Sequence, residues 1–107
     1  MRMYGQMANI VRLSKLMKYA WDQSKNKINQ KKHRVSFEEA MTVIESADYA
    51  QIMDDSSDEH RFKAIGMSEK LRILLVVYCY RDEDMIRIVS ARKATKAEVK
   101  IWHDVKK

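Results

Sequence analysis

The sequence predicts a small α+β domain in which two N-terminal helices and one C-terminal helix pack on one side of a three- to four-stranded antiparallel sheet. Residues 71–80 form an almost unbroken apolar run, rich in β-branched and aromatic side chains, which is typical of a central strand. Residues 60–67 and 85–91 alternate apolar and charged side chains, as half-buried strands do. Two Ser/Thr-x-x-Glu motifs indicate the starts of helices.

The N-terminal half of the domain begins with residues 17–21, which are compatible with a short strand. Asp22 is the expected N-cap of a polar helix over residues 23–33. Ser36 and Glu39 form a capping box that opens a second helix. The apolar side chains of that helix fall on one face: Phe37, Ala40, Met41 and Ile44.

The C-terminal half contains the sheet and the last helix. Residues 49–53 are a candidate strand, and the acidic residues 54–59 form a turn. Residues 82–84 turn the central strand back into the strand over residues 85–91. Thr95 and Glu98 form the second capping box, which opens the C-terminal helix. Three apolar side chains of this helix share a face: Ala97, Ile101 and Val105.

The size of the chain, 107 residues and 12.7 kDa, predicts one folded domain. Cys79 is the only cysteine, so an intramolecular disulfide is excluded and we expect a reducing, cytoplasmic location. No apolar run is long enough to span a bilayer. We interpret residues 1–16 as a loosely ordered N-terminal extension of the domain at residues 17–107, with Met17 as an alternative start of translation.

The net charge of +6 is unevenly distributed along the chain. Residues 1–34 carry a balance of +8, residues 35–59 a balance of −8, and residues 60–107 a balance of +6. Such segregation indicates two oppositely charged surfaces, although a uniformly solvated charged exterior is the alternative. We expect the acidic block to lie away from any surface that binds a nucleic acid.

The composition disfavours metal and cofactor chemistry. His33, His60 and His103 are far apart and match no metal-binding spacing. The two glycines do not form a phosphate-binding loop. Cys79 lies inside the apolar run, where a buried, unreactive thiol is expected. The sequence therefore predicts neither a metal nor a cofactor.

Cations alternate with core residues on the predicted strands. This alternation puts Arg61 and Lys63 on the face that points away from the core, and it does the same for Arg87. Tyr78 and Tyr80 share one face of the central strand. A sheet face that carries arginines and tyrosines is suited to single-stranded RNA, because cations neutralise phosphates while rings stack on bases. The alternative is that these arginines simply face solvent.

RNA can be cleaved without a metal when its 2′-hydroxyl attacks the adjacent phosphate. This reaction needs a group that accepts a proton and cations that offset charge on the phosphate. His33, at the end of a basic helix and beside Lys32, is the best local candidate for the proton acceptor. The alternative is that His33 only complements the dipole of its helix.

From about residue 17 to the C-terminus, the chain resembles the BrnT toxin family. The matching residues are Trp21, Asp22, Lys25, Asn29, residues 32–33 and 35–40, Glu59, Arg61, residues 65–66, 74–77, 86–92 and 94–95, and Glu98. The sequence departs from the family pattern at Arg34, where the family carries glycine. Because glycine suits a left-handed helix exit, Arg34 implies local strain or a different exit.

The resemblance implies a ribonuclease toxin of a type II toxin–antitoxin pair, with a fold similar to RelE-like toxins. It implies a metal-independent endoribonuclease that inhibits translation and growth. It also implies a BrnA-like antitoxin with a ribbon-helix-helix DNA-binding domain, and a complex of two toxins with two antitoxins. Operator DNA would be contacted only through that complex, and no membrane is involved.

Together, the residue patterns and the resemblance yield one set of candidate site residues. Catalysis is assigned to Lys32, His33, Arg61, Arg87 and Arg92. RNA binding is assigned to Lys25, Lys63, Tyr78, Tyr80, Ser90 and Lys93. Two alternative functions stay open: a non-catalytic RNA- or ribosome-binding module, and a protein-interaction domain whose basic surface docks an acidic partner.

Overall fold

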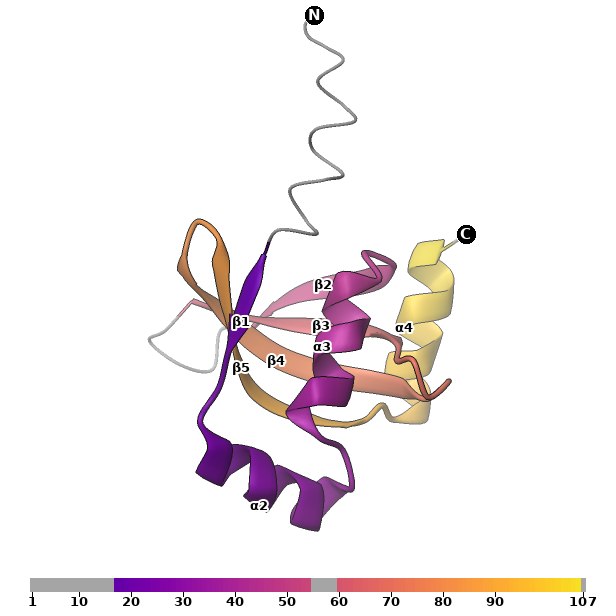
Figure 1. The fold of residues 1–107 in the computed structure, drawn as a ribbon. Coiled ribbons are helices and arrows are strands. Elements are labelled where there is room, and N and C mark those ends of the chain that lie inside the picture. The colour runs from indigo at the N-terminus through magenta and orange to yellow at the C-terminus, as the bar shows by residue number, and fades with distance from the viewer. Residues whose placement is uncertain (1–16, 55–59, 107) are drawn as a thin grey trace, which may run out of the picture.

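The computed structural model describes residues 17–54 and 60–106 (Figure 1). The expected N-terminal extension at residues 1–16 and most of the expected acidic turn lie outside the described residues. The helices and strands follow in this order: β1 (Lys18–Ala20), α2 (Gln23–His33), α3 (Phe37–Glu45), β2 (Tyr49–Asp54), β3 (Arg61–Met67), β4 (Ile73–Asp82), β5 (Met85–Lys93) and α4 (Lys96–Lys106).

The strands form one five-stranded mixed sheet in the order β1-β5-β4-β3-β2. The prediction of three or four antiparallel strands is therefore corrected. β1 joins the sheet by pairing in parallel with β5, with Ala20 opposite Arg87. Parallel pairing is possible because two helices and three strands separate β1 from β5, which gives the chain room to return in the same direction.

Helices cover both faces of the sheet, whereas the sequence predicted helices on one side. α3 packs on the face that carries Leu74, Val76 and Tyr78 of β4, which we call the α3 face (Figure 1). α4 packs against the opposite face, beside Leu75 and Val77, which we call the α4 face. The physical reason is that β4 is apolar at every position along its central part, so both of its faces must be covered.

The buried side of α4 differs from the predicted one. Trp102 is the buried residue of this helix, with 4% of its surface exposed, while Ile101 and Val105 are 39% and 61% exposed. Trp102 anchors the helix because its large ring packs on the sheet and its Nε1 donates to the carbonyl of Asp48, at 3.3 Å. The face shared by Ala97, Ile101 and Val105 is therefore not the buried side of α4.

The two ends of α2 follow from its sequence. Asp22 is its N-cap, as predicted, and the Asp22 Oδ1 accepts from the backbone N–H groups of Ser24 and Lys25. At the other end, Arg34 adopts the left-handed conformation, with φ 60° and ψ 32°. Of the two predicted alternatives, local strain or a different helix exit, the left-handed conformation favours the first, because a residue with a Cβ adopts it at a steric cost. Within the described residues, no helix has the length and apolarity needed to span a membrane.

Candidate functional site

A row of side chains crosses the α4 face near the N-terminal ends of β3 and β5. Arg61 of β3 lies opposite Cys79 of β4, and Cys79 lies opposite Arg87 of β5. Because neighbouring strands are about 4.8 Å apart, the backbones at Arg61 and Arg87 are roughly 10 Å from each other. Both arginines point away from the α3 face, as the alternation predicted. We call these two residues the arginine pair.

Three other predicted residues lie on the same face of the sheet, further along the strands. Lys63 and Ser90 are both opposite Val77, one on each side of β4. Arg92 is opposite Leu75, nearer to α4. The register therefore places five of the predicted residues on the α4 face, and all five are half-buried.

Arg92 is held in place by α4. Its Nη1 and Nη2 donate to the two carboxylate oxygens of Glu98, at 2.8 and 2.9 Å. The hydrogen bonds from Arg92 are the main cause that lowers the pKa of Glu98 to about 2, so this carboxylate stays ionised. Arg92 thus has a carboxylate partner that would compete with a phosphate.

A pocket of about 230 Å³ lies beside the arginine pair, between β1 and the β4–β5 hairpin. Its lining residues are Ala20, Trp21, Asp22, Arg81 and Arg87. We call it the arginine pocket. Arg81 and Trp21 were not among the predicted site residues. The alternation used for Arg61 could have identified Arg81, because Arg81 follows Cys79 by two positions on the same strand.

The tyrosines do not lie on the face that carries the arginines, which corrects the predicted arginine–tyrosine surface. Tyr78 is fully buried on the α3 face, where its ring stacks with Phe62 at 5.7 Å. Its hydroxyl accepts from Gln51 Nε2 at 2.7 Å. Tyr80 lies on the same side and is half exposed. The reason is parity: the tyrosines alternate with Cys79, so they cannot share its face.

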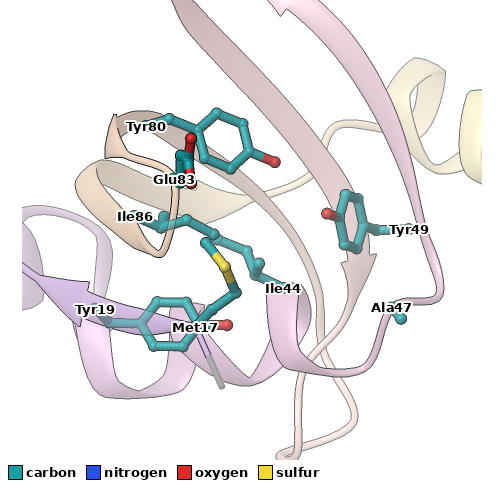
Figure 2. A pocket seen from close by; sticks show the side chains of 8 residues that line it. All are labelled: Met17, Tyr19, Ile44, Ala47, Tyr49, Tyr80, Glu83 and Ile86. Atoms are coloured by element: carbon teal, nitrogen blue, oxygen red, sulfur yellow. The ribbon is translucent and has the colours of Figure 1, made fainter. Parts of the chain in front are cut away.

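Tyr80 contributes to a second pocket of about 230 Å³, on the α3 face (Figure 2). Its lining residues are Met17, Tyr19, Ile44, Ala47, Tyr49, Tyr80, Glu83 and Ile86. Burial, reinforced by the negative charge of Glu45, raises the pKa of Tyr19 to about 12. Glu45 belongs to α3, whereas Asp48 of the same acidic block pairs with Lys106 of α4.

The basic residues of α2 are placed along the edge of β5. Asp22, before the helix, lines the same pocket as Arg87. Further along, the side chain of Asn29 pairs with the backbone of Ala91, donating to its carbonyl at 2.8 Å and accepting from its N–H at 3.3 Å. α2 therefore runs beside β5 in the same direction, and His33, one turn past Asn29, lies toward the C-terminal end of β5.

The candidate catalytic residues consequently fall into two groups. The arginine pair lies toward the N-terminal end of β5, whereas Lys32 and His33 lie near the other end, more than roughly 13 Å away along the strand. Lys25 is exposed on the first half of α2. Lys93 is opposite Leu74, so it points toward the α3 face and away from the arginine pair.

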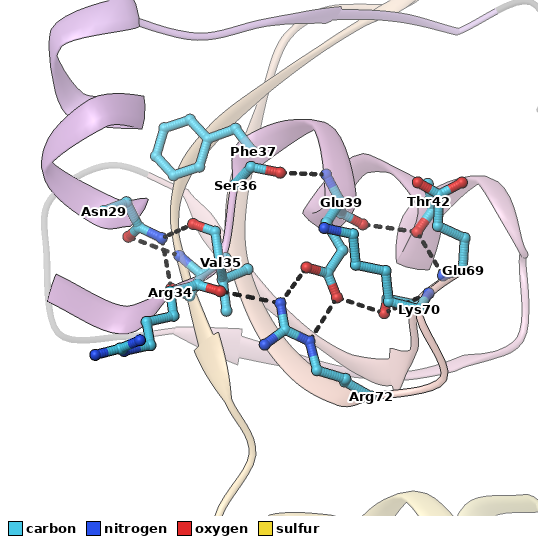
Figure 3. Close-up of polar contacts among 12 residues, drawn as sticks. Asn29, Arg34, Val35, Ser36, Phe37, Glu39, Thr42, Glu69, Lys70 and Arg72 are labelled. Atoms are coloured by element: carbon cyan, nitrogen blue, oxygen red, sulfur yellow. Dashed lines mark hydrogen bonds and ion pairs between the residues drawn. The ribbon is translucent and has the colours of Figure 1, made fainter. Parts of the chain in front are cut away.

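A buried ionic network fixes the link between α2 and α3 (Figure 3). Glu39 accepts from Ser68 Oγ at 2.6 Å and from Arg72 Nε at 3.0 Å, and it also pairs with the Arg72 Nη2. The same Nη2 donates to the carbonyl of Arg34 at 3.0 Å. Burial alone would raise the pKa of Glu39, but the bonds from Arg72 and Ser68 outweigh it and lower that pKa. The network holds the C-terminal end of α2 against the β3–β4 turn.

No cluster of three or more His, Cys, Asp or Glu residues suited to a metal ion occurs among residues 17–54 and 60–106. Four of the five predicted residues on the α4 face are cations: Arg61, Lys63, Arg87 and Arg92. This arrangement suits a polyanion, because arginine forks donate paired hydrogen bonds to phosphate oxygens.

The sequence was compared with models of known protein families. The family model described as "Ribonuclease toxin, BrnT, of type II toxin-antitoxin system" matches residues 21–98. The chain belongs to the BrnT family. The matched range includes α2, α3, the arginine pair and every lining residue of the arginine pocket except Ala20.

The fold is similar to that of the crystal structure of the Brucella abortus ribonuclease toxin BrnT. The TM-score is 0.62 and the sequence identity is 23%, with 75% of this chain and 99% of the Brucella chain covered. Comparison with curated proteins gave no match. Three helices and a five-stranded mixed sheet are therefore the shared BrnT architecture, and membership of this toxin family implies an antitoxin partner.

Proposed function

We propose that this BrnT-family protein is an endoribonuclease that cleaves RNA without a metal and thereby inhibits translation and growth. The proposal is supported by its membership of a ribonuclease toxin family and by the arginine pair on the α4 face. The substrate strand lies along β5, from the arginine pocket toward the C-terminal end of α2.

The reaction is an internal transfer at phosphorus. The ribose 2′-oxygen forms a bond to the adjacent phosphorus, and the bond from phosphorus to the 5′-oxygen of the next nucleotide breaks. The 2′-hydroxyl gives its proton to a base, and the leaving oxygen receives one. Histidine can exchange these protons near neutral pH, and cations stabilise the charge that develops on the phosphate.

The two groups of residues divide this work. His33 accepts the proton and Lys32 stabilises the phosphate that is cleaved, near the C-terminal end of β5. Arg61 and Arg87 hold the strand at neighbouring phosphates, because Arg87 lies too far along β5, and Arg61 beyond it on β3, to share the cleaved phosphate with His33. Ser90 and Lys63 line the path between the two groups, and Lys25 and Lys93 add positive charge near it.

Separate tests of binding and cleavage check this division. We expect the purified protein to cleave a single-stranded RNA in EDTA and to leave 2′,3′-cyclic phosphate and 5′-hydroxyl ends. H33A should lower the single-turnover rate by roughly 100-fold or more, as loss of general acid–base catalysis does, with little change in affinity. R87A should weaken affinity roughly tenfold.

H103A is the matched control. His103 is an exposed histidine of α4, and this helix covers the part of the sheet that is away from β1. It should cleave at the native rate. Native-rate cleavage by H33A would remove the assignment of His33. Cleavage that stops in EDTA and returns with added Mg²⁺ would contradict metal independence. Salt-sensitive RNA binding without any products would favour the alternative, a non-catalytic RNA- or ribosome-binding module.

The antitoxin is proposed to be BrnA-like, with a ribbon-helix-helix domain through which the complex contacts operator DNA. We expect the product of the adjacent reading frame to co-purify with this chain, to block its cleavage of RNA, and to give a complex of two toxins with two antitoxins. Light scattering measures the mass of that complex. An adjacent product that neither binds the chain nor relieves growth inhibition would contradict this part of the proposal.

A further inference from the structure

We propose that the arginine pocket is a nucleotide subsite, which holds a phosphate on Arg81 and Arg87 and a base with an exocyclic amino group between Trp21 and Asp22. This inference rests on the proposed function, because it assumes that the ligand of the α4 face is RNA. It adds a binding site, and a preference for particular bases, to the proposed ribonuclease.

The two arginines of the pocket differ from Arg72 and Arg92 in their partners. Arg72 and Arg92 each pair with a glutamate, whereas no carboxylate among the described residues lies within ion-pair distance of Arg81 or Arg87. Asp22 lines the same pocket but directs Oδ1 to the N-terminus of α2. Two guanidinium groups without a carboxylate partner, in one concave site, favour a bound anion, and phosphate fits their paired donors.

Trp21 is the aromatic residue among those that line the pocket, and it is already fixed in place. It is half-buried, and its ring meets that of Phe37 edge-on, with centroids 6.2 Å apart. A ring that is immobilised by the core loses little entropy when a base stacks on it. Base–aromatic stacking contributes about 1–3 kcal/mol per base in single-strand binding. A volume of about 230 Å³ is below the range for drug-sized ligands, so it suits one nucleotide rather than a longer segment.

Asp22 supplies the preference among bases. Within the described residues, the carboxylate of Asp22 accepts two hydrogen bonds, from Ser24 N and Lys25 N, and both end on Oδ1. Its other oxygen, Oδ2, therefore stays available as an acceptor at the pocket. Carboxylates accept from the exocyclic amino group of cytosine, whereas uracil has a carbonyl oxygen at the same position. The pocket should hence favour cytosine over uracil in otherwise identical strands.

The first test measures the phosphate contacts with an RNA that cannot be cleaved. The probe is a fluorescein-labelled cytidine tetranucleotide whose 2′-hydroxyls are methylated, and its affinity is read by anisotropy over a range of salt concentrations. R81A and R87A should each weaken binding roughly tenfold and lower the slope of log affinity against log salt by about 0.7. K100A removes an equal charge from exposed α4 and should change affinity less than twofold.

The second test measures the base preference. We expect the native protein to bind the cytidine tetranucleotide about fivefold more tightly than the matching uridine one. D22N should abolish that preference while keeping the start of α2, because asparagine is an equally good N-cap. W21F keeps a ring beside Phe37 and should weaken both probes by a few-fold. The thermal unfolding midpoint of each variant identifies any that is misfolded, and R81K then replaces R81A, with weaker binding still expected because lysine lacks the guanidinium fork.

The outcomes of these tests distinguish an error in the proposed nucleotide subsite from an error in the proposed ribonuclease function. R81A and W21F that bind the probe as K100A does would overturn the nucleotide subsite, even if RNA cleavage were intact. An equal affinity of the native protein for cytidine and uridine probes would overturn the base preference. Pocket-dependent binding of the probe by a protein that cleaves no RNA would instead overturn the proposed ribonuclease and support the subsite.

Discussion

The helices α3 and α4 begin with the same motif, Ser/Thr-x-x-Glu, but the two glutamates behave differently. In α4, Glu98 completes the capping box: it accepts from the N–H of Thr95 at 2.9 Å, and its own N–H donates to Thr95 Oγ1 at 3.2 Å. In α3, Ser36 Oγ accepts from the Glu39 N–H at 3.0 Å, but the carboxylate turns inward to Ser68 and Arg72. One motif therefore supports a surface cap in one place and a buried ionic network in the other.

The difference follows from what lies beside each helix start. Glu98 is 20% exposed and binds Arg92 without leaving its cap. Glu39 is 1% exposed, and at this depth a carboxylate needs charged and polar partners more than α3 needs a complete cap. Arg72, from the β3–β4 turn, supplies them by joining Glu39 to the carbonyl of Arg34. The comparison teaches that burial decides whether a capping glutamate serves its own helix or a distant segment.

The largest expected difference between Glu39 and Glu98 is in what each contributes to the free energy of unfolding. E39Q should lower the free energy of unfolding by about 3 kcal/mol, because it leaves the Arg72 charge without its partner in a largely buried site. E98Q is the matched control and should lose about 1 kcal/mol, since its pair is partly exposed and glutamine can still complete a capping box. Urea unfolding measures both values. Equal losses would show that burial does not distinguish the two glutamates.

The pH dependence of stability sharpens the same comparison. Glu98 has a folded-state pKa of about 2, below that of an unfolded glutamate, so the unfolded chain binds more protons. Its stabilising contribution is present above about pH 4.5 and is lost as the pH falls toward 2. The unfolding free energy of the native protein should therefore decline over this range, and that of E98Q should decline less steeply. Parallel curves for the two proteins, from urea unfolding at each pH, would contradict a strong Arg92–Glu98 bond.

Substitutions at Arg34, the strained exit of α2, test whether the Glu39–Arg72 network depends on the backbone or on the side chain of Arg34. R34G relieves the left-handed conformation and keeps the carbonyl that accepts from Arg72, so we expect a gain of about 0.5–1 kcal/mol in unfolding free energy. The glycine's greater freedom in the unfolded chain offsets part of the gain. R34A retains the strain and serves as the control, with no gain. A less stable R34G would mean that the arginine side chain itself supports the network.

Much of the fold could be predicted because it depends on patterns among residues that are close in the sequence. The helix over residues 23–33 and its Asp22 cap match the structure, as does the alternation that puts Arg61 and Arg87 on one face. The central apolar strand was also recognised, but its two-sided burial was not carried through to helices on both faces. Local patterns specify which side of a strand is apolar, whereas the packing of a helix on that side depends on contacts distant in sequence.

The site was harder to predict for the same reason. The tyrosines of β4 were assigned to the arginine surface, although Tyr78 and Cys79 must face opposite sides and Cys79 lies between the arginines. The arginine pocket joins Trp21 to Arg81, sixty residues away, through the parallel pairing of β1 with β5. No spacing in the sequence indicates such a pairing. The partner of Arg92 is local, six residues away, but the sequence alone did not show whether Glu98 would reach it.

The smallest expected effect links the α4 motif to RNA binding. Glu98 now holds Arg92, whereas Arg72 is held by Glu39 inside the protein and cannot reach a ligand on the α4 face. E98Q releases Arg92 while keeping the helix cap, so a single-stranded RNA should bind about threefold more tightly. The slope of log affinity against log salt should steepen by up to about 0.7, the value for one added phosphate contact. Anisotropy with an uncleavable RNA measures both, and the double variant E98Q/R92A is the control. If the gain persists in that double variant, it comes from removing the negative charge of Glu98 and not from Arg92, and the proposed place of Arg92 on the RNA path is wrong.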